Sequence, residues 1–386
     1  MRPPPRAPAP ARFVPLLAVA LLGGLPRGAL AEGPGGPSAA LSPDPVEAQA
    51  SLLSAEFRRD HAEARALVPL AELAGLEDDV TDLARLAVVF GQAADDPKAA
   101  PEVRAYARFR LVGLERSRGN LQRASAELGR LAFLSGWQVA GPFDNEGKRG
   151  FDEVFPPERE QDLAARFPGK AREVGWRALP PEASASGFAF LGAALRPARQ
   201  VVVYALTAVE APREEWVRLY LGASGAVKVF VNGALVHQDP TYHPARFDQA
   251  AVAFVLRAGV NRILVKLCHD EGRLGFFARL TDARGEPLAQ KVRGPPYPAL
   301  LGPSDPKAEP VPGIAAELEK RAREARGSLA AFAHRDLAVL LAERRPGEDR
   351  ERRAAVEARR AAELGPDEVG LRLLAARLED DQNRRR

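Results

Sequence analysis

The chain has 386 residues, 46% of them hydrophobic and 27% charged, a composition that is ordinary for a globular protein of about two or three domains. The formal net charge is only +4 and the basic and acidic residues are interspersed, which argues against a nucleic-acid-binding surface with its basic stripe. The single cysteine, Cys268, excludes an internal disulfide, so the fold must rely on packing alone.

The N-terminus has the pattern of a secretory signal peptide. Three arginines in the first 12 residues form a basic region, an apolar stretch follows, and Ala29–Ala31 offers small residues at a cleavage site. The apolar stretch, Phe13–Leu25, is well short of the roughly 20 residues that span a bilayer. We therefore predict a signal peptide at 1–31, a flexible lead-in at 32–45, and export to the periplasm or the medium without a membrane span.

Residues 46–135 have a helical period, with apolar residues recurring near every 3.6 positions. Pro101 begins a run that ends at Gly119, a helix stop, and Asn120 is placed to cap a second helix directly afterwards. Two antiparallel helices joined this tightly form a helical hairpin, the unit of helical solenoids. The sequence predicts a tetratricopeptide-like helical hairpin segment here.

At Gly136 the period changes toward two, and the pattern becomes that of β-strands. Val227, Val229 and Val231 share one face of a strand, and Asn232-Gly233 follows directly, which is the strongest short signal for a β-hairpin. Similar β-branched runs continue at intervals of about 8–12 residues, separated by turns. We predict about seven or eight strands that form a β-sandwich at 136–292.

The remainder of the chain combines a proline cluster with further helices. The prolines at 293–313 predict a stiff linker, and helices resume over 314–386. The first half of the tetratricopeptide-like repeat expected in this segment is interrupted. The last helix of the segment is too apolar to be exposed to water, so we predict that the segment is incomplete by itself. Four residues match the second half of a tetratricopeptide repeat: Ala354, Ala358, Ala361 and Pro366.

Two stretches carry a resemblance to a known fold: WQVAGPFDNEGKRGFDEVFPPE, at Trp137–Glu158, and Val227–Leu267. Together they resemble the galactose-binding-like jelly roll, a β-sandwich that occurs as an accessory module of glycoside hydrolases. Their placement after helical repeats is similar to the N-terminal part of exported bacterial proteins that continue into a transglutaminase-like domain. The resemblance implies a multidomain α and β protein, with this sandwich flanked by helical segments. It does not imply one function, because this sandwich binds sugars in some relatives and only packs against neighbouring domains in others.

One loop and one tryptophan could form a sugar-binding platform. Sugars need an aromatic face on which to stack and polar groups that pair with hydroxyls. The candidate ligand-binding residues are Trp176, Tyr242, His243, Arg246 and Asp248. Trp176 fits a hydrophobic core equally well.

An acidic loop could hold calcium, which takes six to eight oxygen ligands. The candidate ligands are Asp144, Asn145, Glu146 and Asp152, and jelly rolls of the type that the sequence resembles often carry a structural calcium. A surface loop pinned by the neighbouring aromatic residues explains the same pattern. No glycine-rich loop for a phosphate or a dinucleotide occurs, so no other cofactor is predicted.

Transglutaminase-like chemistry needs a nucleophilic cysteine with a histidine and an aspartate nearby. Cys268 lies inside a strand pattern, where a small buried residue is expected rather than a nucleophile. We therefore predict an exported, non-enzymatic binding or scaffold protein. Its helical repeats and its β-sandwich would bind either a partner protein or a polymer of the cell envelope. Two alternatives stay open: the non-catalytic N-terminal portion of a transglutaminase-like enzyme, and a carbohydrate-binding module.

Overall fold

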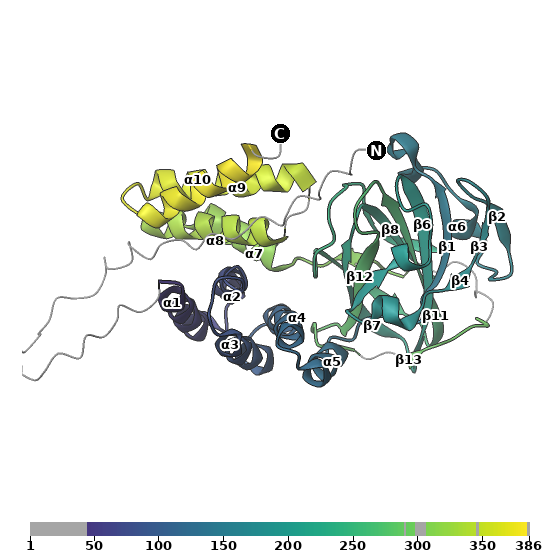
Figure 1. Cartoon of the computed structure of the whole chain (residues 1–386), viewed down its shortest axis with the longest axis horizontal. Helices are drawn as coiled ribbons and strands as arrows, with labels where there is room; N and C mark the ends of the chain where they lie inside the picture. Colours follow the sequence, from purple (N-terminus) through teal and green to yellow (C-terminus); the bar gives the residue numbers. More distant parts are fainter. Residues whose placement is uncertain (1–44, 289–290, 298–305, 345–346, 384–386) are drawn as a thin grey trace, which may run out of the picture.

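The computed structural model describes residues 45–288, 291–297, 306–344 and 347–383. They form a helical part and a β-sandwich that lie side by side (Figure 1). The predicted signal peptide and, except for Pro45, the predicted lead-in lie outside these residues. Among the described helices, none has the length and apolar character that crossing a membrane requires.

The N-terminal helices form antiparallel pairs. They are α1 (Pro45–Asp60), α2 (Leu67–Ala74), α3 (Leu83–Asp95), α4 (Pro101–Ser117) and α5 (Leu121–Gly129), with a 3₁₀ turn at Ala64–Ala66. The predicted hairpin corresponds to α4 and α5, with Pro101 in the first turn of α4. After α5 the chain joins the sandwich, since the Leu134 amide donates to the Ala278 carbonyl at 2.9 Å.

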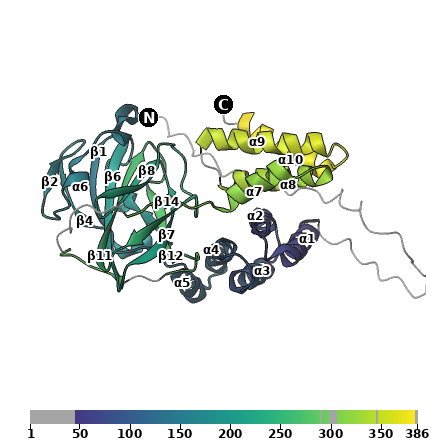
Figure 2. The same cartoon turned by 180° about the vertical axis from the view of Figure 1, so that it is seen from behind.

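The C-terminal helices return to the N-terminal ones, as both views of the molecule show (Figures 1 and 2). They are α7 (Ile314–Glu324), α8 (Ser328–Arg344), α9 (Gly347–Leu364) and α10 (Val369–Asn383). One hydrophobic core contains buried residues of both groups, among them Leu70 and Leu73 of α2 and Leu337 and Leu340 of α8. The sandwich is therefore inserted in the chain between two halves of one helical body.

An ion-pair network reinforces this joint between the chain's two helical segments. Arg65 donates from Nε to Asp336 of α8 at 2.9 Å and from Nη2 to Glu56 of α1 at 3.0 Å. Arg335 of α8 pairs with Glu72 of α2. Helices α7 and α8 thus meet the N-terminal helices, and the apolar last helix, α10, packs on α9.

The β part consists of two antiparallel sheets. The larger sheet has the order β4-β1-β6-β11-β8-β9, with β13 also on β6, and the smaller has the order β14-β10-β7-β12-β5. A separate pair, β2–β3, lies in the insertion between β1 and β6. The strands are β1 (Gln138–Asp144), β2 (Arg166–Pro168), β3 (Glu173–Gly175), β4 (Arg177–Ala178), β5 (Phe188–Phe190), β6 (Val201–Ala211), β7 (Glu215–Ala223), β8 (Ala226–Val231), β9 (Ala234–Asp239), β10 (Ala250–Leu256), β11 (Gly259–His269), β12 (Gly275–Asp282), β13 (Lys291–Val292) and β14 (Glu309–Pro310). Short helical turns occupy Glu146–Phe151, Pro156–Arg159, Pro181–Ser184 and Leu191–Ala193.

The two sheets share one core, which makes the β part a sandwich. Val227, Val229 and Val231 of β8 are buried together with Phe254 of β10 and Phe276 of β12, as the alternation in the sequence predicted. The insertion after β1 covers the outer face of the larger sheet, where its Phe155 and Phe167 form a second cluster with Phe143 of β1 and Tyr204 of β6. The outer face of the smaller sheet meets α4.

The predicted Asn-Gly hairpin is present between β8 and β9. Asn232 has φ of 51° and Gly233 has φ of 87°, the left-handed values that this turn requires. The predicted linker, in contrast, is attached to the sandwich in its described residues. Glu309–Pro310 forms β14 against β10, and the Val255 amide donates to the Pro306 carbonyl at 2.8 Å.

Candidate ligand-binding site

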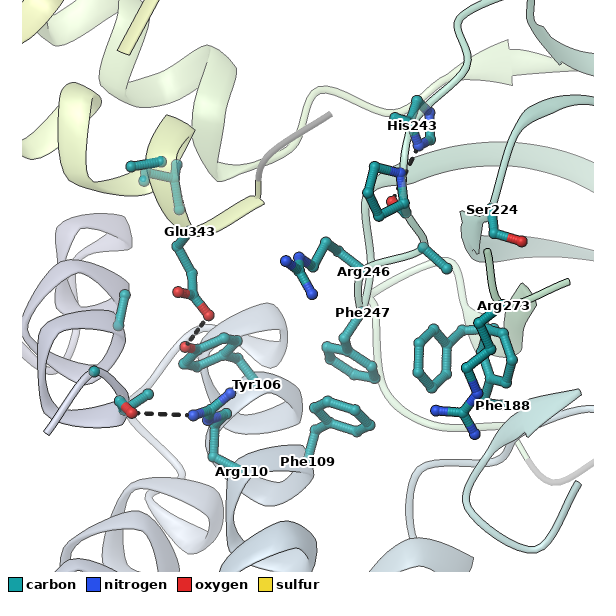
Figure 3. A pocket seen from close by; sticks show the side chains of 18 of the residues that line it. Tyr106, Phe109, Arg110, Phe188, Ser224, His243, Arg246, Phe247, Arg273 and Glu343 are labelled. Atoms are coloured by element: carbon teal, nitrogen blue, oxygen red, sulfur yellow. Dashed lines mark hydrogen bonds between the residues drawn. The ribbon is translucent and has the colours of Figure 1, made fainter. Parts of the chain in front are cut away.

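A cleft of about 1020 Å³ lies where the helical body meets one end of the sandwich. Its helical wall comes from α2, α4, α8 and α10, and its sandwich wall comes from the loops at 242–247 and 269–273 (Figure 3). Side chains far apart in the sequence thus face one space. Pockets at domain interfaces of this kind are preferred ligand sites.

The helical wall is mostly aliphatic, with two polar pairs. Leu67 and Ala71 of α2 line the cleft together with Leu374 and Leu378 of α10. Tyr106 donates its hydroxyl to Glu343 at 2.9 Å, as Figure 3 shows.

The second polar pair joins α4 to the end of α2. Arg110 donates to Glu77 from Nε at 3.0 Å and from Nη2 at 2.7 Å. Burial raises the pKa of Glu77 above its ordinary value although the Arg110 charge opposes this change. This acid is thus engaged with its arginine and is not free to ligate.

The sandwich wall is held by a close approach between the loop at 242–247 and strand β7. A Cβ atom at Gly222 would lie 1.7 Å from the Arg246 carbonyl oxygen, so only glycine admits the loop there. The Gly225 amide also donates to the His243 carbonyl at 2.8 Å. Directly after the loop, buried Asp248 accepts from Nε of buried Arg279 at 2.9 Å.

An aromatic cluster forms the floor between the two walls. Phe109 of α4 stacks on Phe247 of the sandwich loop, with ring centroids 4.4 Å apart and ring planes 8° apart. Phe277 meets both rings edge-on. The Arg273 guanidinium lies over the Phe188 ring, 4.5 Å from its centroid. Arginine held against aromatic rings in a cleft is typical of recognition surfaces.

The structure brings three of the five predicted sugar-binding residues, Tyr242, His243 and Arg246, to the cleft. The other two lie elsewhere. Asp248 is buried in its ion pair with Arg279, so its carboxylate supports the loop instead of facing a ligand. Trp176 is half-buried and packs on the cluster over the larger sheet, outside the cleft lining.

The predicted calcium ligands have other partners. Lys170 places its ammonium group 2.9 Å from Asp144 and 3.2 Å from Glu146, where a cation would have to bind, and its hydrogen bond lowers the pKa of Asp144. The Asn145 amide donates to the Tyr242 hydroxyl at 3.0 Å and accepts from the Gly150 amide at 3.1 Å. Asp152 is exposed. Across the described residues, histidine, cysteine and acidic side chains form no group of three that could hold a metal ion.

Two arrangements near the cleft have the residue types of a nucleophilic site but not the geometry. His269 Nδ1 lies 2.8 Å from the Ser224 carbonyl oxygen and must therefore carry the proton. The Ser224 hydroxyl donates to the Gly275 carbonyl at 2.9 Å, so it is not activated by this imidazole. Cys268 is fully buried, and burial raises its pKa to about 12, which keeps it a thiol at neutral pH.

No protein-family model matches this chain, and no curated protein matches it significantly. Two solved structures of a β-glucosidase from Kluyveromyces marxianus are similar to part of it, one in complex with glucose and one labelled with selenomethionine. Each covers 38% of this chain with a TM-score of 0.24, at identities of 14% and 12%. The match spans only 16% and 17% of the β-glucosidase chains, and a likeness this weak carries no argument about function.

Proposed function

We propose that this chain is an exported, non-enzymatic binding protein that holds its ligand in the cleft between its helical body and its sandwich. The observation that carries the proposal is the cleft itself, about 1020 Å³, with lining residues from both parts. Its volume lies at the upper limit of the range common for small-molecule sites, and its lining combines apolar and aromatic side chains with many charged ones.

The arrangement of the two parts supports this function within the family resemblance described above. The proposal takes the sandwich as a galactose-binding-like jelly roll and the helices as tetratricopeptide-like. Buried Ala354, Ala358 and Ala361 on one face of α9 support the second assignment, since small residues at these positions allow close helix pairing. Export follows from the basic and apolar pattern of the N-terminal sequence.

The non-enzymatic part of the proposal is supported by the two arrangements that chemistry could have used. Cys268 is fully buried and protonated. The Ser224 hydroxyl and the His269 imidazole both donate to backbone carbonyls. His269 Nδ1 lies 3.5 Å from the Ser224 hydroxyl, but this nitrogen carries a proton that it donates to the Ser224 carbonyl, so it cannot accept the proton of the hydroxyl as a general base would.

A variant that fills the cleft tests the proposal. Ala245 lines the cleft from the sandwich loop and is only half-buried, so Ala245→Trp should occupy the space without disrupting a core. The full chain and this variant are assayed against a random peptide library and a glycan array. The matched control is Ala258→Trp, at an exposed turn beyond the far end of β10. We expect binding by the wild type and by Ala258→Trp, and its loss in Ala245→Trp. Binding that Ala245→Trp leaves unchanged would place the ligand elsewhere.

A further inference from the structure

We infer that a second pocket, between the start of α7 and the outer face of the smaller sheet, binds a sugar ring that carries an anionic group, either a carboxylate or a phosphate. This pocket shares no lining residue with the cleft. Its ligand is therefore additional to the ligand of the cleft, and the two sites can be tested separately.

The pocket has a volume of about 380 Å³, which lies within the range common for small-molecule sites. Pro101 and Glu102 line it from the start of α4, and Pro312 and Ile314 line it from the start of α7. Tyr220 lines it from the outer face of β7. Figure 2 shows α7 beginning next to β14, the edge strand of the same sheet. Segments that are distant in the sequence thus border one space.

Three cationic side chains reach this pocket from three different elements. They are Arg218 of β7, Arg284 in the turn after β12, and Lys320 of α7. A Cβ atom at Gly285 would lie 3.6 Å from Nη1 of Arg218, so the Arg218 guanidinium is next to the turn that carries Arg284. Within the described part of the chain, none of the three cations forms an ion pair with a carboxylate.

This gathering of like charges favours an anionic ligand. Cations around one space repel one another, and an anion that lies between them relieves the repulsion. Guanidinium groups bind carboxylates and phosphates in a bidentate manner, so either group fits the arginines.

The pocket lining also contains two acids, Glu102 and Glu317. Glu102 accepts from the Tyr220 hydroxyl at 3.4 Å and from the Ile314 amide at 3.3 Å, so its carboxylate holds the start of α7 against the sheet. Glu317 is exposed on α7, one turn before Lys320. The first amide of α7 is thus already occupied, and the attraction for an anion comes from the side chains.

An exposed aromatic ring extends the pocket along β7. Trp216 lies on the same face of the strand as Arg218, because Val217 and Leu219 point into the core. It is 40% exposed, and Val255 of β10 lies opposite to it in the sheet. An indole in this position offers a flat apolar surface on which the C–H face of a sugar ring can pack.

The two features together define the ligand class. A neutral sugar would leave the cations without an anion, and an inorganic anion would leave the indole without a contact. A sugar ring with a carboxylate or a phosphate uses both, since its charged group reaches the cations while its ring packs on Trp216.

Titrations of the full chain with three sugars test the inference. Glucuronate carries a carboxylate, glucose 6-phosphate carries a phosphate, and glucose is their neutral counterpart. We expect an acidic sugar to bind at least about tenfold more tightly than glucose by calorimetry, and to shift the indole N–H resonance of Trp216. The acidic sugar that binds more tightly identifies the anionic group.

Charge variants locate the binding site. Arg284 and Lys320 are exposed, so the double variant Arg284→Gln with Lys320→Gln should keep the fold and weaken the acidic sugar by about tenfold. Glu317→Gln should strengthen binding by about twofold, because it removes a repulsive carboxylate, and a merely structural role would not produce this gain. Trp216→Ala should weaken the acidic sugar as well.

The controls are Arg199→Gln, a surface arginine that pairs with Glu271 outside this pocket, and the cleft variant Ala245→Trp. Both should leave the affinity for the acidic sugar unchanged. Failure of both acidic sugars to bind more tightly than glucose would overturn the anionic assignment. Affinity that is unchanged in Trp216→Ala would overturn the contact with the ring. Binding that is lost in Ala245→Trp but kept in the double variant would overturn this site and leave the proposed function of the cleft intact.

Discussion

At the scale of the residue, Asp248 illustrates how burial decides the role of a charged side chain. The sequence suggested a ligand-binding carboxylate, because Asp248 ends a loop rich in polar residues. In the structure its side chain is 7% exposed and faces Arg279, whose side chain is 1% exposed. The Arg279 guanidinium also lies 4.3 Å from the centroid of the Tyr220 ring. This pair anchors the cleft loop to the smaller sheet.

Removing the Asp248 carboxylate should therefore cost stability. We expect Asp248→Ala to lower the free energy of unfolding by about 3–5 kcal/mol, because Arg279 would keep a buried charge without its partner. The matched control is Glu271→Ala. The Glu271 carboxylate pairs with Arg199 on the surface, so its removal should lower the free energy of unfolding by less than about 1 kcal/mol. Urea unfolding followed by circular dichroism measures both. Equal effects of the two substitutions would contradict this account.

His237 should make stability depend on pH. It lies on β9, and burial lowers its pKa below the ordinary value of 6.5 although the nearby Asp239 charge opposes this. The unfolded chain then binds a proton more readily than the folded chain, so the free energy of unfolding must fall as the pH drops below about 6.5. We expect His237→Gln to remove part of this fall. Urea unfolding at pH 7 and pH 5 tests it, and an unchanged difference between the two pH values would show that other groups are responsible.

Residue roles could be predicted from sequence only where the cause is local. The positive φ at Asn232 and Gly233 is a property of two adjacent residues, and the burial of Cys268 follows from its strand pattern. Phe109, Phe188 and Arg273 could not be identified as cleft residues, because their common position depends on the docking of α4 against the smaller sheet. Trp176 was placed with the loop residues for the same lack of long-range information.

At the scale of the element, the β8–β9 hairpin depends on its turn. Gly233 has open space around its Cα atom, so a side chain there meets no steric obstacle except its own backbone. We expect Gly233→Val to lower the free energy of unfolding by about 1–2 kcal/mol through the left-handed conformation alone. Gly233→Asn should cost clearly less, since asparagine tolerates this region. Thermal melts of the two variants measure the difference, and equal losses would assign the effect to packing.

The sequence of helix α2 indicates that the helix is covered on all sides. Its residues are apolar on nearly every side, and Leu67, Val68, Leu70 and Leu73 are all fully buried. A helix that is hydrophobic all round must be covered on all sides, not on one stripe. The pattern thus indicated a second layer of helices over α2, although it could not identify the C-terminal segment as that layer.

At the scale of the whole molecule, the insertion of the sandwich between two helical segments makes each segment depend on the other. The sequence divides into three consecutive parts, and its local patterns locate the period changes at Gly136 and after the proline cluster. They contain no information on which parts touch. The shared core of α2 and α8 is a contact between residues more than 250 positions apart, and only the folded chain shows it.

The C-terminal helices should therefore not form a stable domain by themselves. Leu318, Leu337 and Leu340 are buried in the core that they share with α2, and a fragment of residues 313–386 would expose these side chains to water. Asp336, with a side chain 3% exposed, would lose its contact with Arg65. We expect the fragment to melt without cooperativity or to self-associate, and we expect residues 45–135, added as a second chain, to restore a cooperative transition, since they supply the missing face. Circular dichroism melts with sedimentation analysis measure both. A cooperative, monomeric melt of the fragment by itself would mean that its apolar faces are satisfied internally, and that the contact with α2 is an association of two finished units rather than one core completed by both ends of the chain.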